Sequence, residues 1–265
     1  MASLPNILAR IIEQKKLEVA KLKQSFNYAD ANTVIRQLPA SKDLLANLKA
    51  KQQNQQPGII AEIKKASPSL GIIREDFDPI AILEEYERIN AAAISVLTDE
   101  KFFQGSENYL RAVRAKTELP ILRKDFIIDE VQIYQSRMLQ SDCILLIAAC
   151  LDEVQLNDFT ALAHELDLQV LVEVHNFSEL EKALMLPTPL LGINNRDLTT
   201  FKTAIETSLE LKKEVPSDKT VISESGIHHA ADVKRLQVTG INAFLIGETF
   251  MRAETIQQAY EELFT

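Results

Sequence analysis

The sequence predicts a (β/α)8 barrel, or TIM barrel, that follows a helical extension, and three observations support this. Short apolar segments alternate with amphipathic segments eight times from residue 57 onward. The short segments are rich in leucine and β-branched residues and apolar throughout, as parallel strands buried on both faces are. Polar side chains gather where these segments end, which is where such barrels build active sites. We therefore expect one domain over residues 1–265, with the extension at 1–56 and the barrel at 57–265.

The expected elements follow from hydrophobic periodicity. Strands are predicted at residues 59–63, 93–97, 120–123, 143–147, 169–173, 190–193, 220–223 and 243–246. The helices that follow them are predicted at 79–89, 106–116, 130–139, 152–166, 177–185, 203–213, 229–237 and 253–263. In the extension, residues 4–25 and 41–51 carry apolar side chains at helical spacing, so each predicts a helix with one buried face.

An open, doubly wound sheet is the competing architecture for alternating strands and helices. Dinucleotide-binding sheets of that kind carry a glycine-rich turn after the first strand. The segment found at that place is KKASPSLG, from residue 64 to 71, and it lacks that glycine pattern. The sequence therefore favours the barrel.

Composition restricts the class of partner. The 265 residues carry a formal net charge of −9, which argues against a general binder of nucleic acid or of anionic membranes. The two cysteines, Cys143 and Cys150, can form neither a disulfide framework nor a four-thiolate zinc site. No apolar run is long enough for a membrane span, and no secretory signal pattern begins the chain. We expect a cytoplasmic enzyme that acts on a small molecule.

The first predicted strand ends in charged residues. Alternate residues of a strand share a face, so Glu62 and Lys64 point the same way while Lys65 points away from the barrel interior. An exposed surface ion pair between Glu62 and Lys64 is the simpler interpretation of this pattern. The recurrence of polar residues at the other strand ends favours a shared pocket instead.

Two further strands end in charged residues that suit proton transfer. Lys124 and Glu173 emerge from apolar walls, where loss of hydration shifts pKa values toward the neutral form. Because their strands lie two apart, we expect the two side chains to flank a substrate without forming an ion pair. Asn194 and Arg196 share a face, and Arg196 offers a fork for a carboxylate or phosphate, although it could instead bridge to a nearby helix.

The last two strands end in turns that suit phosphate binding. Ser225, Gly226 and Gly247 stand where barrels hold phosphate on main-chain N–H groups. We expect the carboxylates of Glu224 and Glu248 to point away from the dianion, so that Glu248 contributes its main chain alone. The alternative is that both glycines simply make turns.

Aromatic and histidine residues are weaker candidates. Phe103 and Phe126 follow the second and third strands and could form a slot for a flat substrate ring. The histidines His175, His228 and His229 lack the HxH or HxxxH spacing of metal ligands, so we expect no metal site.

Taken together, eight motifs resemble the indole-3-glycerol-phosphate synthase family of tryptophan biosynthesis. They are AEIKKASPS, SVLTDEKFFQGS, LPILRKDFI, ILLIAACL, LVEVH, GINNRDL, SESGI and FLIGE. The resemblance covers the whole chain and implies that the amino-terminal helices lie over the barrel mouth. It implies conversion of 1-(2-carboxyphenylamino)-1-deoxyribulose 5-phosphate to indole-3-glycerol phosphate, a carbon–carbon lyase reaction that releases carbon dioxide and water and needs no cofactor.

The resemblance also implies residue roles. Lys124 matches the general acid of ring closure and Glu173 its acid–base partner, while Glu62 and Lys64 handle charge at the substrate carboxylate and in dehydration. Which lysine protonates which oxygen stays open. By the same resemblance the substrate is oriented and its phosphate held by the remaining positions, namely Asn194, Arg196, Ser67, Ser225, Gly226 and Gly247. Leu70 departs from the lysine or glycine expected there, which leaves the conformation of the first loop open.

Two alternative functions stay open. A phosphoribosylanthranilate isomerase would share the phosphate turns but should use an aspartate and a cysteine, and Cys143 lies within a predicted strand. A non-catalytic ligand-binding barrel would keep the glycines without needing inward lysines and glutamates. We expect a monofunctional enzyme, because the chain ends soon after its eighth barrel helix. We also expect a monomer.

Overall fold

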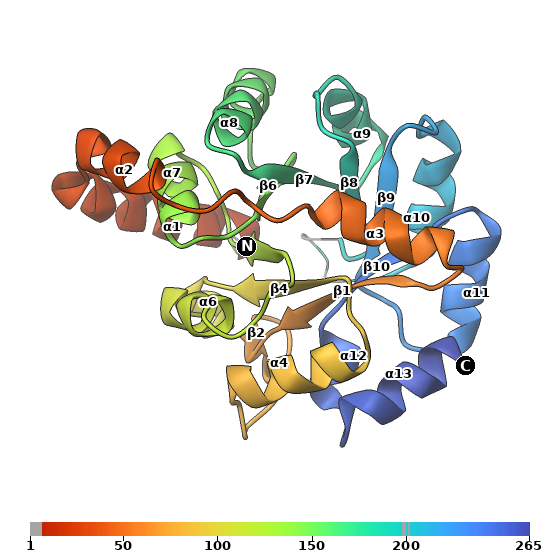
Figure 1. Cartoon of the computed structure of the whole chain (residues 1–265). Coiled ribbons are helices and arrows are strands. Elements are labelled where there is room, and N and C mark those ends of the chain that lie inside the picture. The colour runs from red at the N-terminus through yellow and green to blue at the C-terminus, as the bar shows by residue number, and fades with distance from the viewer. Residues whose placement is uncertain (1–6, 198–199, 201) are drawn as a thin grey trace, which may run out of the picture.

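The computed structural model describes residues 7–197, 200 and 202–265, and its eight parallel strands close into a barrel (Figure 1). The ring closes because β1 pairs with β4 on one side and with β10 on the other. The barrel strands are β1 (Gly58–Ile63), β4 (Ala93–Leu97), β5 (Ile121–Lys124), β6 (Cys143–Ile147), β7 (Gln169–Val174), β8 (Leu190–Asn194), β9 (Thr220–Glu224) and β10 (Ala243–Ile246). The predicted fold class is confirmed.

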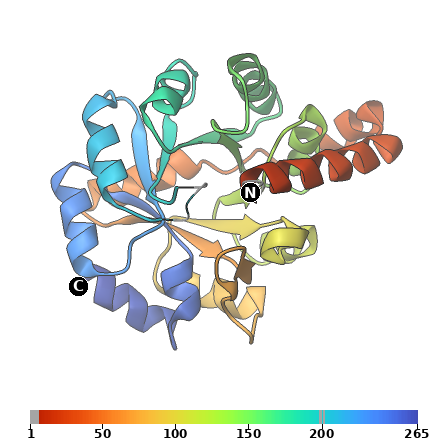
Figure 2. The ribbon, with the colours of Figure 1, turned by 180° about the vertical axis from the view of Figure 1, so that it is seen from behind.

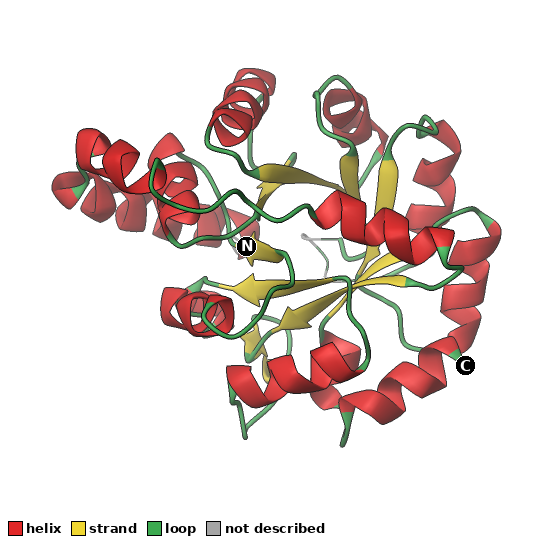
Figure 3. Ribbon diagram, viewed as in Figure 1, coloured by secondary structure: helices red, strands yellow, loops and turns green. Residues whose placement is uncertain are grey.

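Helices surround the strands as an outer layer (Figure 3). The helices that follow the barrel strands are α4 (Pro79–Arg88), α6 (Glu107–Arg114), α7 (Glu130–Met138), α8 (Glu153–Glu165), α9 (Phe177–Leu184), α10 (Glu206–Leu211), α11 (Ala230–Val238) and α13 (Ile256–Phe264). Many begin at a side-chain cap, such as Asp78 before α4 and Asp152 before α8, which satisfies N–H groups of the first turn. The helix predicted at 203–213 begins later, at Glu206 in α10, because Thr203 pairs with Arg196 in a β-bridge, and it ends in a 3-10 turn, η1 (Lys212–Glu214).

Several short elements were not predicted. A hairpin of β2 (Ala66–Ser67) and β3 (Gly71–Ile72) forms the loop after β1, and Leu70 lies exposed in its turn. Single helical turns α5 (Glu100–Phe103) and α12 (Glu248–Arg252) follow β4 and β10. All of them lie at the carboxyl end of the barrel, where loops build the pocket.

Alternation along the strands divides the barrel interior into an apolar floor and a polar mouth. The inward side chains near the strand starts form one buried apolar cluster, which includes Ile60, Leu122, Leu171, Ile222 and Leu245. Two residues further along four of these strands, on the same face, come Glu62, Lys124, Glu173 and Glu224. Each of these four strands therefore places an ionisable side chain at the mouth of the barrel.

The predicted helical extension is present and reaches both ends of the barrel. It consists of α1 (Ile7–Ser25), α2 (Tyr28–Ile35) and α3 (Leu44–Gln53). The start of α1 lies at the mouth, which is seen from the α1 side in Figure 2. Residues 4–6 of the predicted first helix lie outside the described residues. The helix α2 was not predicted, and it packs on α7, where the rings of Tyr28 and Tyr134 lie 5.1 Å apart.

The third helix, α3, covers the opposite end of the barrel, so the expected position over the mouth holds for α1 and is wrong for α3. Leu44 and Leu48 belong to the same apolar cluster as the inward side chains of the barrel floor. The Asn47 side-chain amide donates to the carbonyl oxygen of Ala92 at the start of β4, at 3.0 Å. A Cβ atom on Gly58 would lie 2.8 Å from Leu48 Cδ2, so this close approach needs the glycine.

Leu48→Ala should lower the free energy of unfolding by about 2–5 kcal/mol, since it opens a cavity where α3 closes the barrel floor. Leu48 is 3% exposed, whereas Leu17 on α1 is 68% exposed. Leu17→Ala is therefore the control and should change stability by less than about 0.5 kcal/mol. Urea unfolding measures both. Equal small losses would show that α3 contributes nothing to the closure of the floor.

Candidate active site

The candidate residues from the sequence all line one pocket at the barrel mouth. They come from seven different strand ends or following loops, as expected for a barrel of this type. The pocket contains Glu62, Lys64, Ser67, Phe103, Lys124, Phe126, Glu173, Asn194, Arg196, Ser225, Gly226, Gly247 and Glu248. Sequence reasoning therefore placed these positions correctly in space, while their roles stay predictions.

Lys124 lies at the centre of the pocket, between two carboxylates. Its Nζ atom is 2.7 Å from Glu173 Oε2 and 2.8 Å from Glu224 Oε2. The prediction that Lys124 and Glu173 would not pair is wrong. Strand β9 lies opposite β5 in the closed ring, so the long lysine side chain crosses the interior and meets inward carboxylates from both partner strands.

The position of Glu224 also corrects the sequence analysis, which expected this carboxylate to point away. Glu224 is 1% exposed and faces inward, in the space left by Gly192 on β8. A Cβ atom on Gly192 would lie 2.2 Å from Glu224 Oε1, so a larger residue there would displace the carboxylate. Burial, opposed by Lys124 and reinforced by Glu173, raises the pKa of Glu224 to about 7.

The other two members of this cluster are held in their charged forms. Burial acts to lower the pKa of Lys124, but the carboxylates of Glu173 and Glu224 outweigh it and raise the pKa. Burial acts to raise the pKa of Glu173, but Lys124 and His175 outweigh it and lower the pKa well below its usual range. The predicted shift of Lys124 and Glu173 toward their neutral forms is therefore wrong, because their mutual attraction outweighs the cost of burial.

Glu62 and Lys64 form a second ion pair in the pocket. Lys64 Nζ lies 2.6 Å from Glu62 Oε1, and the two side chains are 17% and 4% exposed. The simpler interpretation as an exposed surface pair is therefore wrong. Tyr86 of α4, which is fully buried, donates from its hydroxyl to the Glu62 carbonyl oxygen at 2.8 Å and fixes this strand end.

Arg196 and its neighbours form the side of the pocket next to the β2–β3 hairpin. The Asn194 amide donates to Glu173 Oε1 at 3.1 Å, and its oxygen accepts from the Arg196 backbone N–H at 3.0 Å. Arg196 donates to Ser69 Oγ and to Glu248 Oε2, both at 2.8 Å. Glu248 thus faces the pocket rather than pointing away, and its charge is balanced by Arg196.

The turns after β9 and β10 bring main chain close to the pocket. Ser225 and Gly226 adopt left-handed conformations, with φ of 64° and 74°. At Gly247, an added Cβ atom would lie 2.3 Å from Glu62 Oε1. A Cβ atom on Gly226 would lie 2.5 Å from Thr203 Cγ2, so both positions require glycine.

Apolar groups form the remaining wall. The rings of Phe103 and Phe126 are tilted against each other with centroids 6.0 Å apart. Ile7, Leu8 and Ile11 of α1 line the same pocket. The arrangement can hold a flat apolar group beside the charged cluster.

Sequence reasoning missed two polar residues, Glu224 and His175. Glu224 follows Ile222 on the inward face of β9, so strict alternation would have found it. His175 Nε2 lies 3.3 Å from Glu173 Oε1, and burial is outweighed by Glu173 and Glu179, which raise the pKa of His175 to about 10. Within the described residues, no group of three or more His, Cys, Asp or Glu side chains could hold a metal, and the pocket lining includes no cysteine.

Comparison with known proteins identifies the family. A family model described as indole-3-glycerol phosphate synthase matches residues 8–263. Proteins named indole-3-glycerol phosphate synthase from Legionella pneumophila (strain Paris) and Delftia acidovorans are 52% and 48% identical to this chain. Each alignment covers 98% of this chain and 99% of the relative.

Solved structures of low identity share the fold. Tryptophan synthase subunit alpha from Legionella pneumophila aligns over 83% of this chain and 95% of its own, with a TM-score of 0.58 and 9% identity. The 3-hexulose-6-phosphate synthase from Salmonella typhimurium aligns over 78% and 96%, with a TM-score of 0.62 and 12% identity. These likenesses concern the barrel alone. The family match and the two close relatives establish that the chain belongs to the indole-3-glycerol phosphate synthase family.

Proposed function

We propose that the chain converts 1-(2-carboxyphenylamino)-1-deoxyribulose 5-phosphate to indole-3-glycerol phosphate, as a decarboxylating carbon–carbon lyase of tryptophan biosynthesis. The observation that carries this proposal is the buried Lys124 ammonium between Glu173 and Glu224, beside the aromatic wall. A site for simple ligand binding would have no need of three buried ionisable groups. The family membership gives the same reaction class.

Ring closure needs a proton donor and a way to dispose of charge. The ring carbon that bears the carboxylate forms a bond to the ketone carbon, and the ketone oxygen takes a proton as the carbonyl π bond breaks. The bond to the carboxylate then breaks, carbon dioxide leaves, and its electron pair restores the aromatic ring. The hydroxyl group finally leaves as water, with the loss of one proton from the new five-membered ring.

The buried cluster is suited to these proton transfers. Lys124 is charged and can protonate the developing alkoxide, because the alkoxide is a stronger base than the Lys124 amine. Glu173 is charged and can stabilise the cation or accept a proton. Glu224, whose pKa is about 7, can exchange a proton at neutral pH. The pair of Glu62 and Lys64 is placed to assist at the carboxylate and in dehydration.

The rest of the pocket provides binding contacts. The substrate ring would lie in the slot of Phe103 and Phe126, oriented by Asn194, Arg196 and Ser67. Its phosphate would lie on the main chain of Ser225, Gly226, Gly247 and Glu248, where the glycines allow close approach. We further propose that the chain acts in the cytoplasm as a monomer. No helix among the described residues is long and apolar enough to cross a membrane.

Lys124→Met and Glu173→Gln should each lower turnover by at least about 10²-fold, because each removes a positioned proton-transfer group. The Michaelis constant should change much less. Lys65→Met is the matched control, since the Lys65 side chain does not line the pocket. Steady-state kinetics on the folded variants measure the turnover number and the Michaelis constant of each. Retention of full turnover in Lys124→Met or Glu173→Gln would contradict the proposed roles, and an essential Lys65 with a dispensable Lys64 would reverse the inward assignment at the end of β1.

Substrate affinity should fall as the pH rises through about 7, because Glu224 then gains a negative charge in a pocket that binds an anion. Below that pH the carboxyl group is neutral. Glu224→Gln should remove the part of the pH dependence of substrate affinity that comes from Glu224. The part that comes from ionisation of the substrate phosphate should remain. The measurement is the Michaelis constant on either side of neutrality. An identical pH dependence in the variant would assign the ionisation to another group.

Gly247→Val should sharply weaken binding of a simple phosphate ester such as glycerol phosphate, since the side chain fills the main-chain cradle. The new side chain would also displace Glu62, whose Oε1 lies 2.3 Å from the position of the added Cβ. Glu62→Gln separates the two effects, because it alters that carboxylate while keeping the glycine. Calorimetric titration should find phosphate affinity retained in Glu62→Gln alone. Retention in both variants would place the phosphate site elsewhere.

A further inference from the structure

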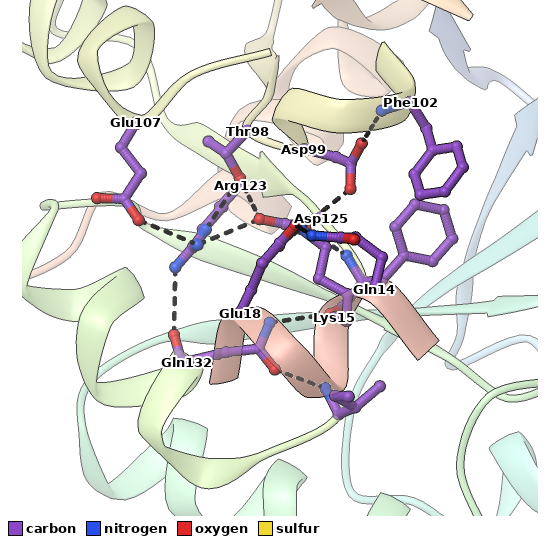
Figure 4. Close-up of polar contacts among 12 residues, drawn as sticks. Gln14, Lys15, Glu18, Thr98, Asp99, Phe102, Glu107, Arg123, Asp125 and Gln132 are labelled. Atoms are coloured by element: carbon purple, nitrogen blue, oxygen red, sulfur yellow. Dashed lines mark hydrogen bonds and ion pairs between the residues drawn. The ribbon is translucent and has the colours of Figure 1, made fainter. Parts of the chain in front are cut away.

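A buried ionic cluster joins α1 to the two loops beside the active site (Figure 4). Lys15 Nζ lies 3.0 Å from Asp99 Oδ2 and 2.9 Å from Asp125 Oδ1. These three side chains are 4%, 0% and 3% exposed. Glu18, one turn further along α1, accepts from Lys15 at 2.8 Å. None of these groups takes part in the proposed proton transfers.

Both aspartates fix the backbone of a loop that carries a pocket phenylalanine. Asp99 Oδ1 accepts from the Phe102 backbone N–H at 2.8 Å and caps α5, whose last residue is Phe103. Asp125 directly follows Lys124 in the sequence, and its Oδ1 accepts from the Phe126 backbone N–H at 2.8 Å. Lys15 therefore binds the two carboxylates that set the positions of the aromatic slot.

The same lysine is the main polar attachment of α1 at this place. The buried residues of α1 are Ile11, Lys15 and Val19. Ile11 lines the pocket one turn before Lys15 on the same helix face. Other polar links from α1 to these loops, such as Lys101 to Gln14 at 2.6 Å, are exposed, and exposed pairs contribute little.

Charge balance makes the cluster depend on Lys15. Asp125 has a second cation, Arg123, whose Nη2 lies 3.2 Å from its Oδ2. For Asp99, Lys15 is the one cation within ion-pair distance among the described residues. Burial raises the pKa of Asp99, and Lys15 opposes that shift. Without Lys15, the Asp99 carboxylate would stay buried and unpaired, which is strongly unfavourable, so the loop and α1 would move apart to admit water.

We propose that Lys15 is a positioning residue for substrate binding, which holds α1 against the β4–α5 and β5–α7 loops and thereby sets the spacing of Phe103, Phe126 and the α1 wall of the pocket. The effect of Lys15 on substrate binding rests on the proposed function. The attachment of α1 by Lys15 is independent of the proposed function.

The first test compares Lys15→Met with Lys16→Met on the full chain. Lys16 is the adjacent residue on the same helix, 60% exposed and paired with Glu13. In Lys15→Met, hydrogen exchange should accelerate in residues 7–25, 99–103 and 125–126. The Michaelis constant should rise by at least about tenfold, with turnover changed much less, since misplaced binding groups weaken productive binding. Lys16→Met should match the unmodified chain in both measurements.

A double variant separates positioning from stability. In Lys15→Met combined with Asp99→Asn, the unpaired buried charge is removed, while the asparagine oxygen can still cap Phe102. The melting temperature should recover toward that of the unmodified chain, but the raised Michaelis constant and the fast exchange of α1 should remain, because the contacts of Lys15 to both loops are still missing. This variant also serves if Lys15→Met alone does not fold.

Recovery of exchange and of the Michaelis constant together with stability would overturn the proposal and leave Lys15 a purely structural role. Unchanged exchange of residues 99–103 and 125–126 in Lys15→Met would overturn it as well. Hydrogen exchange needs no turnover, so it decides on the attachment of α1 even if the unmodified chain proved inactive on the proposed substrate, which would reject the proposed function separately.

Discussion

An ammonium group held between two carboxylates is stable in this barrel because Lys124 compensates the burial of Glu173 and is itself compensated by Glu173 and Glu224. Loss of hydration penalises all three groups, and removal of Lys124 would leave the two carboxylates without the cation that lies between them. Lys124 keeps its proton and Glu173 keeps its charge because they are paired, while burial, reinforced by the Glu173 carboxylate, raises the pKa of Glu224 and shifts it toward neutrality. Replacement by apolar residues would pack at least as well, so the cluster is better explained by chemistry than by stability.

The closed barrel makes this cluster possible. Alternation along four of the strands places an apolar residue at the floor and an ionisable one at the mouth, as in Ile222 and Glu224. The helix α3 seals the floor against water. Gly192 leaves the volume that the Glu224 carboxylate occupies. The charged groups therefore line a pocket at the mouth, beside α1 and the loops after β4 and β5.

Much of this arrangement could be predicted from the sequence, because the hydrophobic pattern indicates both the order of the strands and which side chains of a strand share a face. That pattern gave the eight strands, the barrel, and the inward positions of Glu62, Lys124 and Glu173. The same rule applied to β9 also predicts that Glu224 points inward. The expected phosphate site in the turn after β9 instead led to the prediction that this carboxylate points away. The pairing of Lys124 across the barrel could not be predicted, since it depends on the barrel width and on side-chain tilt.

The extension was harder to place. An amphipathic pattern says that a helix buries one face and does not say which surface covers it, so the position of α3 under the floor could not be predicted. The short α2 lacks a long periodic pattern and depends on its Asn27 cap and on packing against α7. The ionic contacts of Lys15 join residues more than 80 positions apart, a relation that no local pattern contains.

The most direct test of the account is to mix the unmodified protein with 1-(2-carboxyphenylamino)-1-deoxyribulose 5-phosphate and follow indole fluorescence. The chain contains no tryptophan, so the indole product is observed without a protein background. The account predicts a rise in fluorescence that matches the carbon dioxide released, mole for mole. Saturable binding of the substrate with no indole formed would contradict it and make this pocket a ligand-binding site without catalysis.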